Sequence, residues 1–158
     1  MNSTSHSAAP VKLHVATAVI PLRRADIDSA AHVNNTNYFR FMEEARMVWY
    51  ESHGIEGDFG DPHAPGRKPS VLPPGCGPII VTASCSFSKA LKFPGDAIID
   101  VYISEPGRSS IVISYVFRAS YAPETVFAEG STKAVWINNK EEKSIPLPEV
   151  VRALFNRA

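Results

Sequence analysis

One long helical pattern stands among segments typical of β-strands, and this imbalance limits the folds open to the chain. From Val33 to about His53, hydrophobic residues recur at steps of three and four, the spacing of one helix face. Phe39 and Tyr50 flank this stripe, so we expect the helix to be covered on several sides. Gly54 then provides the residue type usual just beyond a helix C-terminus. The stripe consists of Tyr38, Phe41, Met42, Ala45, Val48, Trp49 and Ser52.

The other regular segments are rich in Val, Ile, Thr and aromatic residues, which predicts strands. Short turns at 106–108 and 122–124 separate the last three of them, so we expect antiparallel pairing between successive strands. One helix cannot cover both faces of such a sheet, and the simplest solution is a curved sheet. The sequence therefore predicts an α+β fold, a five-stranded antiparallel sheet wrapped around a long central helix, with a short helix over 148–156. The predicted strands are 11–22, 79–89, 96–105, 109–121 and 125–138.

Length and charge narrow the class of protein. The 158 residues suit one domain, which we place at 11–158 after a disordered tail over 1–10. Lys plus Arg and Asp plus Glu both number 16, so the zero net charge argues against a nucleic-acid partner. No secretory signal or membrane-spanning run is present, and we expect a cytoplasmic protein without a membrane partner. Cys76 and Cys85 lack the spacing of a metal site, so we expect two reduced thiols.

Glycine and proline dominate residues 55–78, which predicts a long loop without regular structure. A loop of this length inside a compact domain is uncommon and is often functional. Two interpretations stay open. The loop is either a variable surface insertion, or a segment that gates the substrate or contacts a partner subunit.

A crowd of polar residues precedes the helix. Asp26, Asp28, His32, Asn34 and Asn35 lie where the first backbone amides of a helix have no partner within the helix. Such a position can hold an anion or a polarised carbonyl group. This stretch is therefore our candidate for the catalytic site.

These residues carry a resemblance to a known family. Asp26-Ile27-Asp28, His32-Val33-Asn34-Asn35, Tyr38, the Glu43–Arg46 segment and Phe87–Asp96 resemble motifs of the hotdog-fold thioesterases, in particular the 4-hydroxybenzoyl-CoA thioesterase-like branch of acyl-CoA thioesterases. The resemblance implies a homodimer or homotetramer with active sites at the subunit interface. It also implies hydrolysis of acyl-CoA or acyl-carrier-protein thioesters to a free acid, without a metal or another cofactor. Ala31 stands where many members have glycine, so the turn before His32 could differ.

The same resemblance suggests roles for single residues. Asp28 matches the family's catalytic aspartate, which acts either as a general base on water or as a nucleophile that forms a mixed anhydride. The backbone N–H of Asn35 matches the donor to the thioester oxygen. His32 either orients water or polarises the carbonyl, or it hydrogen-bonds the loop in place. For Asp26 we favour a structural role.

Basic side chains favour the phosphates of coenzyme A, and Lys89, Lys92 and Arg118 are our candidates for that contact. Two other functions occur on the same fold. A hotdog dehydratase is disfavoured because its proline-rich run after the histidine is absent here. A non-catalytic module that binds acyl-CoA remains an alternative, as does a thioesterase for carrier-protein substrates.

Overall fold

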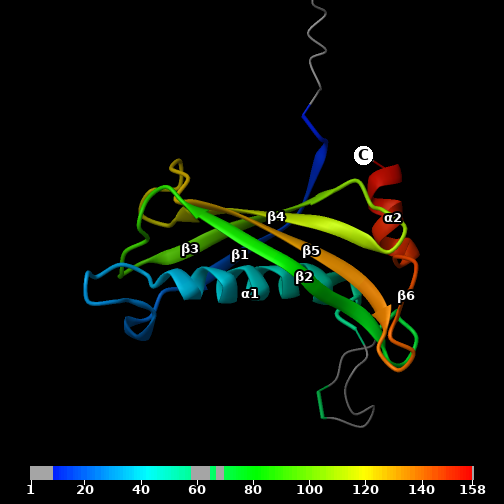
Figure 1. Ribbon diagram of the computed structural model, residues 1–158. Helices are drawn as coiled ribbons and strands as arrows, with labels where there is room; N and C mark the ends of the chain where they lie inside the picture. The colour runs from blue at the N-terminus through cyan, green and yellow to red at the C-terminus, as the bar shows by residue number, and fades with distance from the viewer. Residues whose placement is uncertain (1–8, 58–64, 67–69, 158) are drawn as a thin grey trace, which may run out of the picture.

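The computed structural model describes residues 9–57, 65–66 and 70–157, and it consists chiefly of one curved sheet and one long helix. The sheet arches over helix α1 (Asn35–His53), and the short helix α2 (Glu149–Asn156) lies at one end of the sheet (Figure 1). A short 3-10 helix, η1 (Arg24–Asp26), follows the first strand. The strands are β1 (Lys12–Pro21), β2 (Cys76–Phe87), β3 (Asp96–Ser104), β4 (Ser110–Ala119), β5 (Ala128–Asn138) and β6 (Lys143–Ser144).

The strands run in the order β1-β3-β4-β5-β2, every neighbouring pair is antiparallel, and β6 pairs with β5. The predicted antiparallel sheet around a long helix is confirmed, with two corrections. Residues 139–147, which fall between the last predicted strand and the predicted short helix, contain the two-residue strand β6. Successive strands pair from β3 to β5, but β2 lies beside β5 and not beside β3, because the link over 88–95 is a crossover and not a hairpin.

Strand β2 begins at Cys76, inside the stretch that we expected to lack regular structure. Pro78 has no N–H to donate, and an edge strand tolerates this because one side of its backbone has no partner strand. Part of the glycine- and proline-rich loop, 58–64 and 67–69, lies outside the described residues. The same is true of most of the predicted N-terminal tail.

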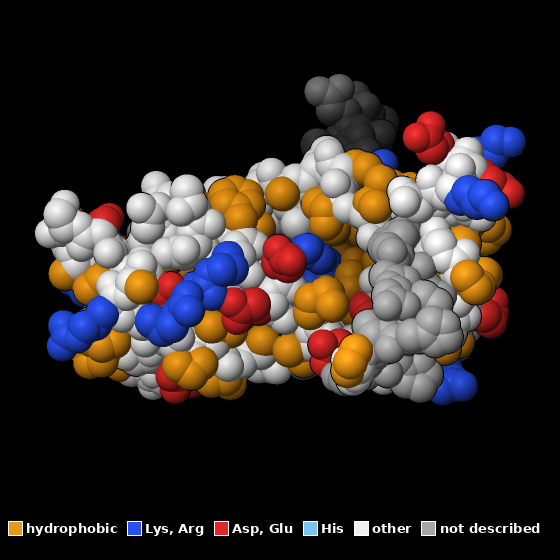
Figure 2. Space-filling model, turned by 90° about the horizontal axis from the view of Figure 1, so that it is seen from below, with side chains coloured by type: hydrophobic (Ala, Val, Ile, Leu, Met, Phe, Trp, Pro, Cys, Tyr) orange, Lys and Arg blue, Asp and Glu red, His pale blue; other side chains and the backbone are white. Residues whose placement is uncertain are grey.

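The core forms between α1 and the concave face of the sheet. Gly130 of β5 marks how closely the two approach, because a Cβ atom there would lie 2.2 Å from the sulfur of Met42. The opposite side of α1 is open: Val48, which we placed in the buried stripe, is 46% exposed and Phe39 is 41% exposed. Charged side chains of both signs alternate with hydrophobic ones on this side of the molecule (Figure 2). The buried residues of α1 are Tyr38, Phe41, Met42, Ala45, Trp49 and Tyr50.

Both ends of α1 are capped. The Asn34 side chain accepts a hydrogen bond from the backbone N–H of Thr36, so the helix begins two residues after the predicted start. Gly54 ends it with φ of 65°, the left-handed conformation that glycine adopts without strain.

Candidate functional site

The segment between β1 and α1 is a short closed loop. A bridge pairs Ile27 with Val33 at its base. The backbone N–H of Asp28 donates to the carbonyl oxygen of His32 (2.8 Å), and that of Ala31 donates to the carbonyl oxygen of Asp28 (3.1 Å). These bonds fix the direction in which residues 28–32 point. The loop is therefore set by its own backbone before any ligand is present.

Asp28 is exposed, and its carboxylate is only half used by the loop. Oδ1 accepts hydrogen bonds from the N–H groups of Ala30 (2.9 Å) and His32 (3.2 Å). Within the part of the chain that the structure describes, Oδ2 has no hydrogen-bond partner. One oxygen thus positions the side chain, and the other is available to a water molecule or a carbonyl carbon.

The start of α1 offers an unused donor close by in the chain. Asn34 accepts the N–H of Thr36 with its side chain and that of Asn37 with its carbonyl oxygen. Among the described residues, the backbone N–H of Asn35 has no acceptor. This amide lies at the positive end of the helix dipole, where a developing negative charge is stabilised.

Asp26 ties the loop to the helix. It is 2% exposed, and its carboxylate accepts hydrogen bonds from Arg23 and Arg40. Its carbonyl oxygen accepts the backbone N–H of Asn34 and the side-chain amide of Asn37, both at 2.9 Å. Burial by itself raises the pKa of the Asp26 carboxyl, but the hydrogen bonds from Arg23 and the charges of Arg40 and Arg23 hold it below the ordinary value of 3.8. The structural role expected for Asp26 agrees with these contacts.

His32 faces a separate hollow of about 430 Å³, which Lys89, Ala90, Lys92, Tyr121 and Phe127 complete. A bridge pairs His32 with Lys92, and the N–H of Val33 donates to the carbonyl oxygen of Leu91 (2.9 Å). The backbone of His32 makes the loop contacts, and its side chain is left at the hollow. The structure therefore brings two of the predicted coenzyme A contacts, Lys89 and Lys92, beside His32.

Arg118 does not join them. Its neighbours Phe117 and Ala119 are fully buried against the α1 side of the sheet, so Arg118 points from the opposite face. There its Nε lies 3.8 Å from Asp100 Oδ2 of β3. The candidate contact of Arg118 with coenzyme A is thus separated by the sheet from the loop that carries Asp28.

Two residues that line the hollow, Tyr121 and Phe127, were not predicted from the sequence as site residues. They lie in the β4–β5 connection, far along the chain from His32, and no local motif marks them. The β4–β5 connection lies beside residues 89–92 because of how β4 pairs with β3 and β5 in the sheet. The N–H of Lys92 donates to the hydroxyl oxygen of Tyr121 (2.9 Å).

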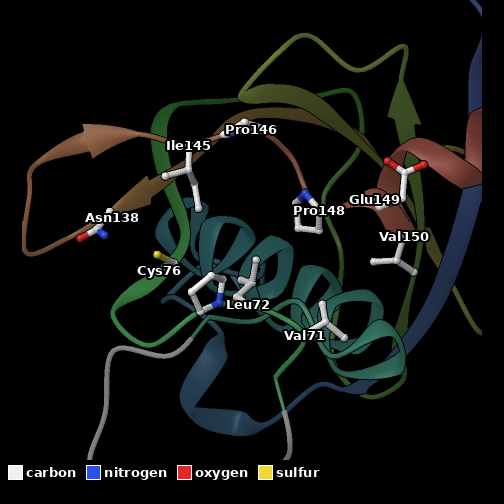
Figure 3. A pocket seen from close by; sticks show the side chains of 10 residues that line it. Val71, Leu72, Cys76, Asn138, Ile145, Pro146, Pro148, Glu149 and Val150 are labelled. Carbon is white, nitrogen blue, oxygen red and sulfur yellow. The ribbon is translucent and has the colours of Figure 1, made fainter.

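A second cavity, of about 500 Å³, lies elsewhere. It is lined by residues from the segment before β2, from Asn138, and from the segment that leads into α2 (Figure 3). Val71 donates its N–H to the carbonyl oxygen of Gly54, which places this cavity near the C-terminal end of α1. None of the predicted site residues lines it.

Two kinds of feature are absent from the described residues, 9–57, 65–66 and 70–157. No group of three or more His, Cys, Asp or Glu side chains there could hold a metal ion. No helix in those ranges is long and apolar enough to cross a membrane.

Comparison with known proteins identifies similar chains. A sequence model of the thioesterase-like superfamily matches residues 22–155. A proposed esterase of Aquifex aeolicus is 26% identical over 129 residues, which cover 82% of this chain and 89% of that protein. Among solved structures, a proposed thioesterase from Pseudomonas aeruginosa is 31% identical with a TM-score of 0.77, covering 90% of this chain and 99% of that one. A gentisyl-coenzyme A thioesterase is 25% identical with a TM-score of 0.66, covering 86% and 98%. These similarities confirm the hotdog fold.

Proposed function

Because the chain belongs to the thioesterase-like superfamily, we propose that it hydrolyses an acyl-CoA thioester to a free carboxylic acid and coenzyme A, with Asp28 as the reacting group. The observation that carries the role of Asp28 is its half-used carboxylate, held in a closed loop directly before the uncapped first amide of α1. The gentisyl-coenzyme A thioesterase among the similar structures supports a coenzyme A thioester as substrate.

The chemistry needs little beyond these groups, because a thioester is already activated and a thiolate leaves readily. In one route Asp28 takes a proton from water as the water oxygen attacks the carbonyl carbon. The carbonyl oxygen becomes an oxyanion that accepts the N–H of Asn35; the C–S bond then breaks and the thiolate regains the proton. In the other route an Asp28 oxygen attacks directly, the thiolate leaves, and water hydrolyses the mixed anhydride. Neither route requires a metal.

His32 serves the same site in this proposal. Its backbone already holds the loop, which leaves the imidazole to orient the attacking water or the substrate. Replacement of His32 by alanine should then lower kcat by roughly tenfold or more, in the range for a positioned acid or base, without loosening the loop.

The substitution Asp28→Asn tests the proposal. Asparagine keeps an oxygen that can accept from Ala30 and His32, so the loop is retained while the reactive carboxylate is lost. The rate at which the Asp28→Asn variant hydrolyses a panel of acyl-CoAs, measured by the release of free thiol, should be lower than that of the wild type by roughly a hundredfold or more.

Two controls sharpen this result. Asn35→Ala keeps the backbone amide and should change the rate little, and Glu43→Gln alters an exposed charge on α1. Full activity of the Asp28→Asn variant would remove Asp28 from the mechanism. A wild-type protein that binds acyl-CoA but hydrolyses no acyl-CoA or carrier-protein thioester would instead be the non-catalytic module.

We also propose a homodimer or homotetramer built along β2. This edge strand leaves one side of its backbone without a partner strand, and it exposes Val81 (50%) and Phe87 (44%). The Phe87 ring contacts that of Tyr38 with centroids 4.8 Å apart, so a second copy along β2 would reach the first turns of α1. The free thiols Cys76 and Cys85 fit a cytoplasmic location.

A further inference from the structure

The second cavity has no part in the proposed reaction. Its volume of about 500 Å³ is in the range of cavities that bind small molecules. Asp28 precedes the start of α1, whereas Val71 of the cavity is hydrogen-bonded to Gly54, just beyond the end of the helix. The 19 residues of α1 span about 28 Å, so the cavity and the Asp28 loop of one chain lie at opposite ends of the helix.

The lining of the cavity is mainly apolar. Three of the described lining residues are prolines, which have no backbone N–H to offer and hold their own φ angles fixed. Leu72 and Cys76 are 8% and 3% exposed and form the floor, while Val71, at 60%, belongs to the rim. Water finds few hydrogen-bond partners in such a place, so an apolar molecule displaces it at little cost.

Hydrogen bonds brace the walls of the cavity from three sides. The N–H of Val71 donates to the carbonyl oxygen just beyond α1 (2.8 Å), and the N–H of Ile145 donates to a carbonyl oxygen of β5 (2.9 Å). On the third side, Nη2 of Arg152 in α2 donates to two carbonyl oxygens of the β3–β4 turn, at 3.0 and 2.6 Å. Because the walls are held in this way, the cavity stays open without a ligand.

Asn138, at the end of β5, supplies a hydrogen-bond donor to the cavity (Figure 3). Its Oδ1 accepts the N–H groups of Lys140 (3.0 Å) and Glu141 (3.1 Å), and these two bonds fix the orientation of the amide. Within the described part of the chain, Nδ2 of Asn138 has no acceptor. A ligand with a carbonyl oxygen can therefore accept a hydrogen bond from it.

The charge of the lining favours an uncharged ligand. Among the described residues that line the cavity, only Glu149 carries a charge, and it is exposed. Its carboxylate points away from Val71 and Leu72 (Figure 3). An ammonium or carboxylate ion inside the cavity would thus lose its water without gaining a partner, which costs far more than burying a neutral group. At the rim, Glu149 also repels an anion.

We propose that this cavity binds an uncharged, mainly aliphatic molecule with one carbonyl oxygen, which accepts a hydrogen bond from Asn138 Nδ2. A medium-chain ketone is a simple compound of this class. The site is separate from the Asp28 loop, and the free acid released by hydrolysis, being an anion, is not its ligand. The proposal uses no residue of the reaction, so it stands or falls independently of the thioesterase function.

Isothermal titration calorimetry of the full chain tests the chemistry of the ligand. Nonan-2-one, nonanoate and protonated nonylamine have the same number of carbon atoms but differ in charge. The wild-type protein should bind the ketone with a Kd below about 1 mM, and should bind each ion at least roughly tenfold more weakly. Absence of ketone binding, or equal affinity for the ketone and either ion, would refute the proposal.

Substitutions test the position of the ligand. Val71→Trp fills the rim of the cavity from an exposed position and should abolish binding of the ketone. Val48→Trp, at a position on α1 that is 46% exposed, is the matched control and should leave Kd within about twofold. Unchanged binding in the Val71→Trp variant would mean that the ketone binds elsewhere.

Asn138→Asp tests the hydrogen bond. Aspartate keeps an oxygen for the N–H groups of Lys140 and Glu141 but removes the amide donor. The Kd for nonan-2-one should rise by roughly fivefold or more, the effect of one lost hydrogen bond. An unchanged Kd would remove Asn138 from the site.

Kinetics test whether the two sites are separate. Nonan-2-one should leave KM for acyl-CoA unchanged. A rise in KM that the Val71→Trp substitution abolishes would make the cavity part of the substrate site and overturn the separation. If the protein hydrolyses no thioester, the proposed function fails, and the titrations alone decide whether the cavity is a ligand site.

Discussion

Ala31 is held in a conformation that suits glycine better. Its φ is 62°, and a non-glycine residue in the left-handed region is disfavoured by roughly 1–2 kcal/mol. Ala31→Gly removes this strain but adds entropy to the unfolded chain, worth roughly 0.5–1 kcal/mol. We therefore expect the free energy of unfolding in urea to stay level or to rise by up to about 1 kcal/mol.

Ala30 supplies the control, because it lies in the same turn without a positive φ. Ala30→Gly brings only the entropic cost and should lower the free energy of unfolding by roughly 0.5–1 kcal/mol. Equal losses in the two variants would show that the conformation of Ala31 carries no strain.

Asp26 makes the stability of the protein depend on pH. Its pKa is lower in the folded chain than the ordinary 3.8, so its contribution is fully present above that value and is lost as the pH falls through the folded pKa. Asp26→Asn leaves Arg23 and Arg40 without their shared carboxylate. We expect a loss of roughly 2 kcal/mol or more in urea unfolding at pH 7.

The difference between Asp26→Asn and the wild type should stay constant down to about pH 5 and shrink below about pH 4, where the wild-type carboxyl also becomes neutral. A Glu44→Gln variant, which removes another partner of Arg40, is the matched control. Glu44 is exposed, so its loss should cost less than about 1 kcal/mol. A difference that persisted unchanged at low pH would place the role of Asp26 in packing and not in charge.

For single residues, the sequence predicted which side chains lie near the start of the helix, but not which hydrogen bonds their individual atoms make. The motif placed Asp28 before the helix, yet only the structure separates the oxygen that binds the loop from the one left free. Lys89 and Lys92 were predicted from charge alone; the bridge between His32 and Lys92 brings them beside His32, and their contact with coenzyme A stays a prediction. Arg118 was predicted for the same reason; it lies on the other face of the sheet beside Asp100, and its contact with coenzyme A stays a prediction.

Among the elements, the contact between β5 and α1 leaves no room for growth. A methyl group at Gly130 would lie 2.2 Å from the Met42 sulfur, and Met42 is 1% exposed. Gly130→Ala should therefore lower the free energy of unfolding by roughly 1–3 kcal/mol, the usual cost of overpacking a core.

A double-mutant cycle identifies the source of that cost. Met42→Ala alone opens a cavity and should be destabilising, but Gly130→Ala added to it should cost much less than in the wild type. Additive losses in urea unfolding would mean that the backbone of Gly130, and not the sulfur of Met42, limits the site.

Elements with one strong local signal were predicted well. Helix α1 has a hydrophobic stripe and a terminating glycine, both of which were predicted from the sequence, but the cap at Asn34 that sets its first residue was not predicted. The start of β2 and the whole of β6 were not predicted. A strand at a sheet edge needs no strongly hydrophobic sequence pattern, and the nearby prolines are typical of a loop. The exposure of Val48 was also missed, since periodicity gives a face of a helix but not how far the sheet curves around it.

For the whole molecule, the edge of β2 governs assembly in our proposal. Val81→Lys places a charge on that edge and should convert the oligomer to a monomer, as light scattering and sedimentation would show. Val19→Lys, on the opposite edge strand β1 and 60% exposed, should leave the assembly intact. A wild-type protein that is a monomer at all concentrations would contradict both the oligomer and an active site at the subunit interface.

The closed base of the loop between Ile27 and Val33 has a consequence for how this protein can change. Because the loop ends are fixed by the bridge and by the contacts of Asp26, the five residues between them can be exchanged without disturbing the strand before or the helix after. New chemistry can thus arise at the tip at a cost of about 1 kcal/mol or less in folding stability for each substitution, the size expected above for Ala30 and Ala31. Substitutions in residues 28–32 should therefore leave the fold of the flanking strand and helix intact.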